Sequence, residues 1–127
     1  MILKPASIGV KISDYPTFSG RHDDWYSFKA KYCALTRIHG YRDVIDVFDL
    51  DFSTLSISEH HSKRDSDMSY DQRVRDTYAI LEIRTADSTA ASLVTRHART
   101  QDGALAWRSL RDYYDQDGNK DVYEVRC

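Results

Sequence analysis

Large apolar side chains recur at intervals of three or four residues in several separate stretches of the chain, and this spacing restricts its fold more than any other feature. Between positions 24 and 39 five of them follow it: Trp25, Phe28, Tyr32, Leu35 and Ile38. Side chains at this spacing share one face of an α-helix. The stretch therefore predicts an amphipathic helix whose aromatic face is buried.

The same periodicity predicts four more helices, over 41–48, 70–84, 88–98 and 102–115. The helix at 70–84 includes Tyr78 and Leu81 in its apolar stripe. In the last stretch, GALAWRSLRDYYD, the side chains expected to point inward are Leu105 or Ala106, Trp107, Leu110 and Tyr114. The serine-rich segment 49–68 shows no period and is predicted to be a loop, in which His60 and His61 are solvated.

These elements predict an all-α fold, a compact bundle of about five helices with a short extended N-terminal arm. Only 2 prolines and 5 glycines occur in 127 residues, too few for a turn-rich β-sandwich. The expected organisation is an arm over 1–22, a helical domain over 23–116, and a linker with the start of a truncated further helix over 117–127. The last segment suggests that the chain is cut from a longer protein.

The composition fits a soluble globular domain, with 41% hydrophobic and 30% charged residues. The formal net charge of −2 gives no global electrostatic reason to bind nucleic acid. No stretch resembles a signal peptide or a membrane span, so no membrane partner is expected. The two cysteines, Cys33 and Cys127, form neither a zinc pattern nor a disulfide framework, and Cys33 reads as a small buried hydrophobe. A cytoplasmic location is the expectation.

No set of residues in the chain matches a catalytic pattern, so neither an enzyme nor a cofactor is expected. The nearest metal motif is a calcium-type loop in which Asp115, Asp117, Gly118 and Glu124 fit, but Tyr113 replaces the first ligand. A solvated turn is the preferred interpretation. Basic residues gather in the last two helices but alternate with aspartates, which favours a solvated, salt-bridged face; they are Arg96, Arg99, Arg108 and Arg111.

Two stretches become informative when they are read together. FSGRHDDWYSFKAKYCALTRIHGYRDVID, residues 18–46, resembles the start of the Gag polyprotein of copia-type LTR retrotransposons, in which a Phe-x-Gly turn precedes a tryptophan helix, a Gly-Tyr pair and a short Val/Ile segment. DGALAWRSLRDYYD, residues 102–115, is similar to the family's later Ala-Trp-x-x-Leu-x-x-x-Tyr helix. The spacing at 78–84 also agrees, so the resemblance covers roughly 18–115.

The resemblance implies a helical capsid N-terminal domain, a structural protein that multimerises around the RNA of the element. The positions that match the family's motifs are core and framework positions: Phe18, Gly20, Trp25, Ala106, Trp107, Leu110 and Tyr114. The chain contains no CCHC zinc knuckle and no protease triplet. Contact with RNA is therefore expected through regions beyond Cys127, and the partner of this chain is expected to be itself.

The predicted function is thus a Gag capsid domain that self-assembles into a virus-like shell around the element's RNA. The alternative is a helical adaptor module, derived from or resembling Gag, that binds a partner protein. The expected core and framework residues are Phe18, Gly20, Trp25, Phe28, Tyr32, Leu35, Tyr78, Leu81, Ala106, Trp107, Leu110 and Tyr114. An assembly interface is expected on the exposed side of the first two helices and the arm, at Arg21, His22, Tyr26, Lys29 and Arg42, with weak association of the isolated chain.

Overall fold

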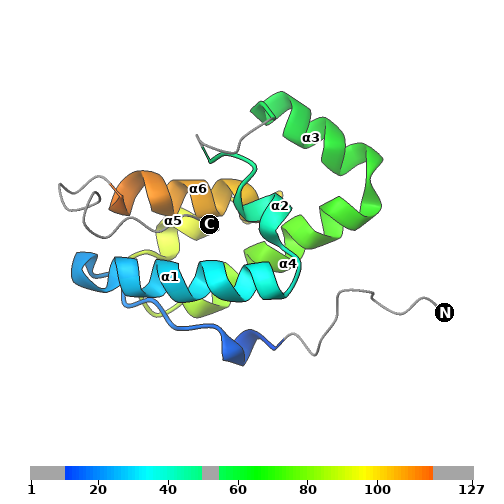
Figure 1. The fold of residues 1–127 in the computed structure, drawn as a ribbon. Coiled ribbons are helices and arrows are strands. Elements are labelled where there is room, and N and C mark those ends of the chain that lie inside the picture. Colours follow the sequence, from blue (N-terminus) through cyan, green and yellow to red (C-terminus); the bar gives the residue numbers. More distant parts are fainter. Residues whose placement is uncertain (1–10, 50–54, 116–127) are drawn as a thin grey trace.

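The computed structural model describes residues 11–49 and 55–115, and all regular structure in these ranges is helical (Figure 1). A 3-10 turn, η1, precedes six α-helices. In chain order the elements are η1 (Ile12–Asp14), α1 (His22–Ile38), α2 (Arg42–Ile45), α3 (Ile57–Ser66), α4 (Met68–Arg84), α5 (Ala91–Thr95) and α6 (Gly103–Tyr114). The prediction of an all-α bundle is confirmed.

Helices α1, α2, α4 and α6 lie where the periodicity placed them, and α5 is shorter than the predicted 88–98. The prediction of a loop over 49–68 was wrong, because α3 occupies much of it. Helix α3 begins with a capping box, in which the Ser56 side chain accepts from the Glu59 N–H and the Glu59 carboxylate accepts from the Ser56 N–H. This motif satisfies two amides at the start of a helix that has little apolar periodicity.

In Figure 1, α1 and α6 lie side by side, and α4 and α5 lie behind them. The short α2 packs against both α6 and α4, which closes one end of the bundle. Helix α3 packs on α4 and extends away from the other helices. Of the four longer helices, α1, α4 and α6 thus form the bundle, and α3 is attached at one corner of it.

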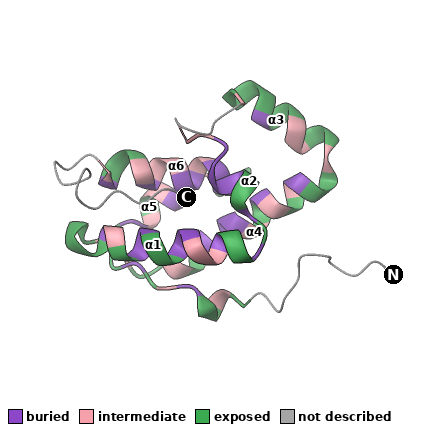
Figure 2. Ribbon diagram, viewed as in Figure 1, coloured by how far each residue is buried: buried purple, intermediate pink, exposed green. Residues whose placement is uncertain are grey.

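Helices α1 and α6 each contain several buried residues, which Figure 2 colours purple along the ribbon. Ile38, which the spacing placed on the inner face of α1, is instead 62% exposed. The buried face of α1 continues from Tyr32 to Thr36, four positions or about one helical turn later. Thr36 can be buried because its hydroxyl donates to the Tyr32 carbonyl at 2.9 Å. Ile38 therefore lies past the core, on the last turn of the helix.

The described part of the predicted arm does not stand apart from the domain. Tyr15 and Phe18 are each 1% exposed and belong to the main core. The Phe18 N–H donates to the Arg84 carbonyl at 3.0 Å, and the Tyr15 hydroxyl is 2.7 Å from Nδ1 of His39. Residues 11–21 therefore form a structural layer across the ends of α1 and α4.

A glycine at the start of α6 allows α6 to cross α4 closely. A Cβ atom on Gly103 would lie 1.9 Å from the Thr77 hydroxyl and 2.6 Å from the Val74 carbonyl oxygen. Backbone cannot yield at such a distance, so any other residue would force the two helices apart. Asp102 precedes this glycine and caps the helix, since its carboxylate accepts from the Leu105 N–H at 3.0 Å.

Candidate functional site

Six rings that the two motif stretches supply lie together between α1, α6 and the segment before α1. This aromatic cluster consists of Phe18, Trp25, Phe28, Tyr32, Trp107 and Tyr114, each at most 3% exposed. Ring centroids are 5.5 Å apart for Trp25 and Trp107, and 4.5 Å apart for Tyr32 and Trp107. Both pairs are tilted, and aromatic contacts at these separations add to the free energy of burial. The helices that carry Trp25 and Trp107 therefore meet through their aromatic faces.

The other framework residues extend the same core. Tyr78, Leu81, Ala106 and Leu110 are buried in it, and Leu35 is half-buried at its edge. Of the alternatives at the start of α6, Ala106 points inward and Leu105 is only half-buried. Cys33 is also buried in this core, as predicted, but it is disulfide-bonded, which the sequence did not lead us to expect.

Gly20 holds the turn between Phe18 and α1, and its backbone requires glycine. Its φ of +85° lies in the left-handed region, and a Cβ atom there would be 2.6 Å from the Thr89 hydroxyl. The Tyr114 hydroxyl donates to the Gly20 carbonyl at 2.8 Å. The front and back motifs are therefore joined by a hydrogen bond as well as by ring packing.

The predicted assembly residues do not form one patch. His22 lies in the first turn of α1 and Arg42 lies beyond its end, so the 17 residues of α1 separate them by about 25 Å. Arg21 and Arg42 are exposed, and Tyr26 is half-buried against the core. The His22 ring contacts Tyr114, with centroids 4.9 Å apart.

Lys29 was wrongly predicted to be exposed. It is 6% exposed, and its Nζ lies 2.9 Å from the Asp115 carboxylate, which also accepts from the Trp25 indole at 2.5 Å. A lysine stem can cover apolar surface while its ammonium finds a partner, and here that partner is Asp115, the residue that follows α6. Lys29 is therefore a structural residue, unavailable to another molecule.

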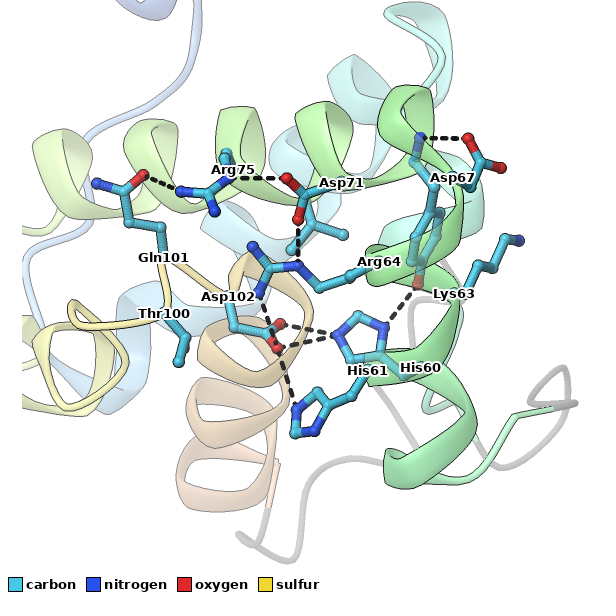
Figure 3. Close-up of polar contacts among 12 residues, drawn as sticks. His60, His61, Lys63, Arg64, Asp67, Asp71, Arg75, Thr100, Gln101 and Asp102 are labelled. Atoms are coloured by element: carbon cyan, nitrogen blue, oxygen red, sulfur yellow. Dashed lines mark hydrogen bonds and ion pairs between the residues drawn. The ribbon is translucent and has the colours of Figure 1, made fainter.

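A buried polar network, which the sequence analysis missed, joins α3, α4 and α6 (Figure 3). Nε2 of His60 lies 2.9 Å from Oδ2 of Asp102, and its Nδ1 lies 2.8 Å from the Tyr70 hydroxyl. All three side chains are fully buried. Arg64 approaches Asp102 at 3.5 Å and pairs with Asp71 at 2.6 Å. The prediction that His60 is solvated was wrong, while His61 is exposed as expected.

The Asp102 carboxylate is held in its ionised form. Burial alone would raise its pKa, but hydrogen bonds from His60 and the Leu105 N–H, with the charges of His60 and Arg64, outweigh burial and hold the pKa below its ordinary value. Since Asp102 accepts, Nε2 of His60 carries a proton, and Nδ1 accepts from Tyr70 when the ring is neutral. One carboxylate therefore caps α6 and anchors α3.

The order carboxylate, imidazole, hydroxyl is that of a general-base relay, but its burial favours a structural role. A pocket of about 260 Å³ lies beside it, lined by His61, Arg64, Asp65, Asp71, Arg75 and Thr100. Neither His60 nor Tyr70 lines this pocket, so a substrate there would not touch the relay. The positive charges of Arg64 and Arg75 are already paired with Asp71.

The sequence did carry signals for this network. The Ser56-x-x-Glu59 pattern is a capping box, which predicts a helix start just before His60. Asp102 precedes a helical stripe at the position of an N-cap, which explains its burial. The partnership of His60 with Asp102 spans 42 residues and has no local signature.

Some of the remaining predicted sites include residues that lie outside the described ranges. The calcium-type loop falls mostly on 116–127, which lie outside them. Within 11–49 and 55–115, no group of three or more histidine, cysteine or acidic side chains could hold a metal ion. Arg108 lies 3.7 Å from Asp112 and Arg111 lies 3.8 Å from Asp49, in agreement with the predicted salt-bridged face, and Nε2 of His97 contacts the Ser109 hydroxyl.

A second hollow, the α1 groove, lies between η1 and the outer face of α1. It has a volume of about 350 Å³ and is lined by Asp14, Pro16, Lys31, Ala34 and Leu35.

Among the described residues, no helix is long and apolar enough to cross a membrane. In comparisons with known proteins, no family model, no curated protein and no solved structure matches the chain.

Proposed function

We propose that the chain is the capsid N-terminal domain of a copia-type retrotransposon Gag protein, a structural unit that assembles with copies of itself into a shell. The observation that supports this most is the packing of the two family-like stretches into one aromatic cluster. Trp25 and Trp107, 82 positions apart, have ring centroids 5.5 Å apart. Framework residues that carry a resemblance are expected to pack together in this way.

The distribution of polar groups favours a structural role over catalysis. The most organised polar network, centred on His60 and Asp102, is fully buried and fixes α3 and α6. The packed aromatic cluster and the ion pair at the end of α6 stabilise a rigid domain. A rigid unit suits a shell because each contact can then be made without the cost of ordering the surface.

The proposed shell contacts use the two ends of α1. Arg21 and His22 supply one contact surface and Arg42 supplies another, with Tyr26 between them. Two separate surfaces on one rigid helix suit a lattice, where each copy must touch more than one neighbour. The packaged RNA would contact segments beyond Cys127, and assembly would take place in the cytoplasm.

The test is to express the complete product of the gene and to measure particles that protect RNA from nuclease. Arg21→Glu reverses the charge at the proposed contact and should abolish particles. The fold should survive, because the Arg21 side chain is 69% accessible and only a surface ion pair with Asp23 is lost. Arg96→Glu, on an exposed residue at the end of α5, is the matched control. Circular dichroism should show both variants folded. Particle formation by Arg21→Glu at the wild-type level would exclude this contact.

The alternative of an adaptor module that binds a partner protein is favoured by the α1 groove, which is a concave apolar surface. The two functions differ in what the complete gene product forms. A capsid protein gives particles without any other protein, whereas an adaptor remains dispersed and binds one partner at a fixed ratio. Light scattering of the purified product separates these outcomes.

A further inference from the structure

The α1 groove has an apolar floor that continues into exposed surface. Pro16, Ala34 and Leu35 line it, and Ile38 follows Ala34 by four positions on the same face of α1. Ile38 is 62% exposed, although an isoleucine side chain gains free energy when it leaves water. The groove and Ile38 together form a continuous apolar strip on the outside of the bundle.

Charges of opposite sign lie at this strip. Asp14 comes from η1 and Lys31 from α1, and both line the groove. They do not pair with each other, and neither forms an ion pair with any other residue that the structure describes. A partner that carried only one sign of charge would leave one of the two without a counter-charge.

We propose that a second copy of the chain occupies the α1 groove, through a two-fold symmetric contact in which Asp14 of each copy meets Lys31 of the other. Such a contact uses one surface patch twice, so the patch must be complementary to itself. One carboxylate, one ammonium and an apolar strip meet this requirement. The inference rests on the proposed function, because it names one contact through which copies would join in a shell.

The contact should be weak. Stable complexes bury about 800 Å² on each partner, and a groove with five lining residues and one isoleucine supplies only part of that area. We expect a dissociation constant on the order of 100 µM. Weak pairwise contacts suit a lattice, since many copies together supply the avidity.

The test is sedimentation equilibrium of the 127-residue chain from micromolar to millimolar concentration. D14K and K31D should each weaken the dimer at least about tenfold, because like charges then face each other. An equal mixture of the two variants should restore it, since each reversed side chain then meets its opposite. The double variant D14K/K31D should restore it as well. D65K on α3 and R96D after α5 are matched controls and should leave the dimer unchanged.

Circular dichroism of each variant shows whether it folds. I38E places a charge on the apolar strip without reversing an existing one, and it should also abolish the dimer. Amide NMR shifts that depend on concentration should be confined to η1 and the outer face of α1. A wild-type chain that remains monomeric at millimolar concentration overturns the proposal. So does a dimer that withstands both single variants, or single variants that stay monomeric when mixed. Particles formed by the complete gene product of D14K would contradict the groove contact while leaving the proposed function standing.

Discussion

Lys29 and Asp115 form a largely buried ion pair, 2.9 Å between Nζ and Oδ2, that joins the middle of α1 to the residue following α6. The Trp25 indole donates to the other carboxylate oxygen. These two bonds hold the C-terminal end of α6 against the middle of α1.

Lys29→Met should lower the free energy of unfolding by about 1–3 kcal/mol, because the Asp115 carboxylate then loses its counter-charge in a partly buried setting. The Trp25 donor remains, and Asp115 is about a quarter accessible, which limits the loss. Lys31→Met on the solvent side of the same helix is the control and should change stability by less than about 0.5 kcal/mol. Urea denaturation measures both. Equal effects of the two variants would mean that the pair contributes nothing.

Trp25→Ala and Trp107→Ala should each lower the free energy of unfolding by about 3–5 kcal/mol. Removing both rings in this way would consume most of the stability of a small domain. The coupling between them is therefore measured with the milder pair Trp25→Leu and Trp107→Leu. Because the rings touch, the double variant should depart from additivity by at least about 0.5 kcal/mol. Additive effects would contradict the direct contact.

The hydroxyl groups of two buried tyrosines predict opposite results for the same substitution. The buried Tyr32 hydroxyl has no hydrogen-bond partner among residues 11–49 and 55–115, whereas the Tyr114 hydroxyl donates to the Gly20 carbonyl. Tyr32→Phe should leave stability unchanged or raise it by up to about 1 kcal/mol, and Tyr114→Phe should lower it by about 1 kcal/mol. Thermal unfolding of the two variants compares them directly. A larger loss from Tyr32→Phe than from Tyr114→Phe would contradict these contacts.

Asp102 should make the protein sensitive to acid. Its pKa is lower in the folded chain than the ordinary value of 3.8, so its contribution to stability is complete above that value and is lost as the pH falls through the folded-state pKa. The stability difference between wild type and Asp102→Asn should therefore shrink as the pH falls below about 5. Asp65→Asn on the exposed part of α3 is the control. A difference that stays constant to pH 2 would show that Asp102 is not the group that titrates.

Most of the fold follows from local patterns that a single sequence displays. Trp25, Trp107 and Tyr114 are large, regularly spaced and unable to remain in water without cost, so their burial could be predicted. Helix α3 has no such stripe. Its formation depends on a capping box and on the burial of one histidine, which is why periodicity alone missed it.

The errors at Lys29 and His60 have one physical cause. Each is a polar side chain whose burial depends on a carboxylate far along the chain, Asp115 for Lys29 and Asp102 for His60. Without the partner, burial of either group would cost free energy, so the sequence favours exposure. A single sequence does not reveal which distant carboxylate folds back to meet them.

Electron microscopy of the complete gene product, purified without other proteins, tests the capsid proposal most directly. We expect closed shells of a repeating unit into which the bundle of α1 to α6 fits, with the two ends of α1 at contacts between neighbours. The same samples give the RNA content after nuclease treatment. A product that stays dispersed at all salt and protein concentrations tried, or that forms a one-to-one complex with another protein, would contradict it.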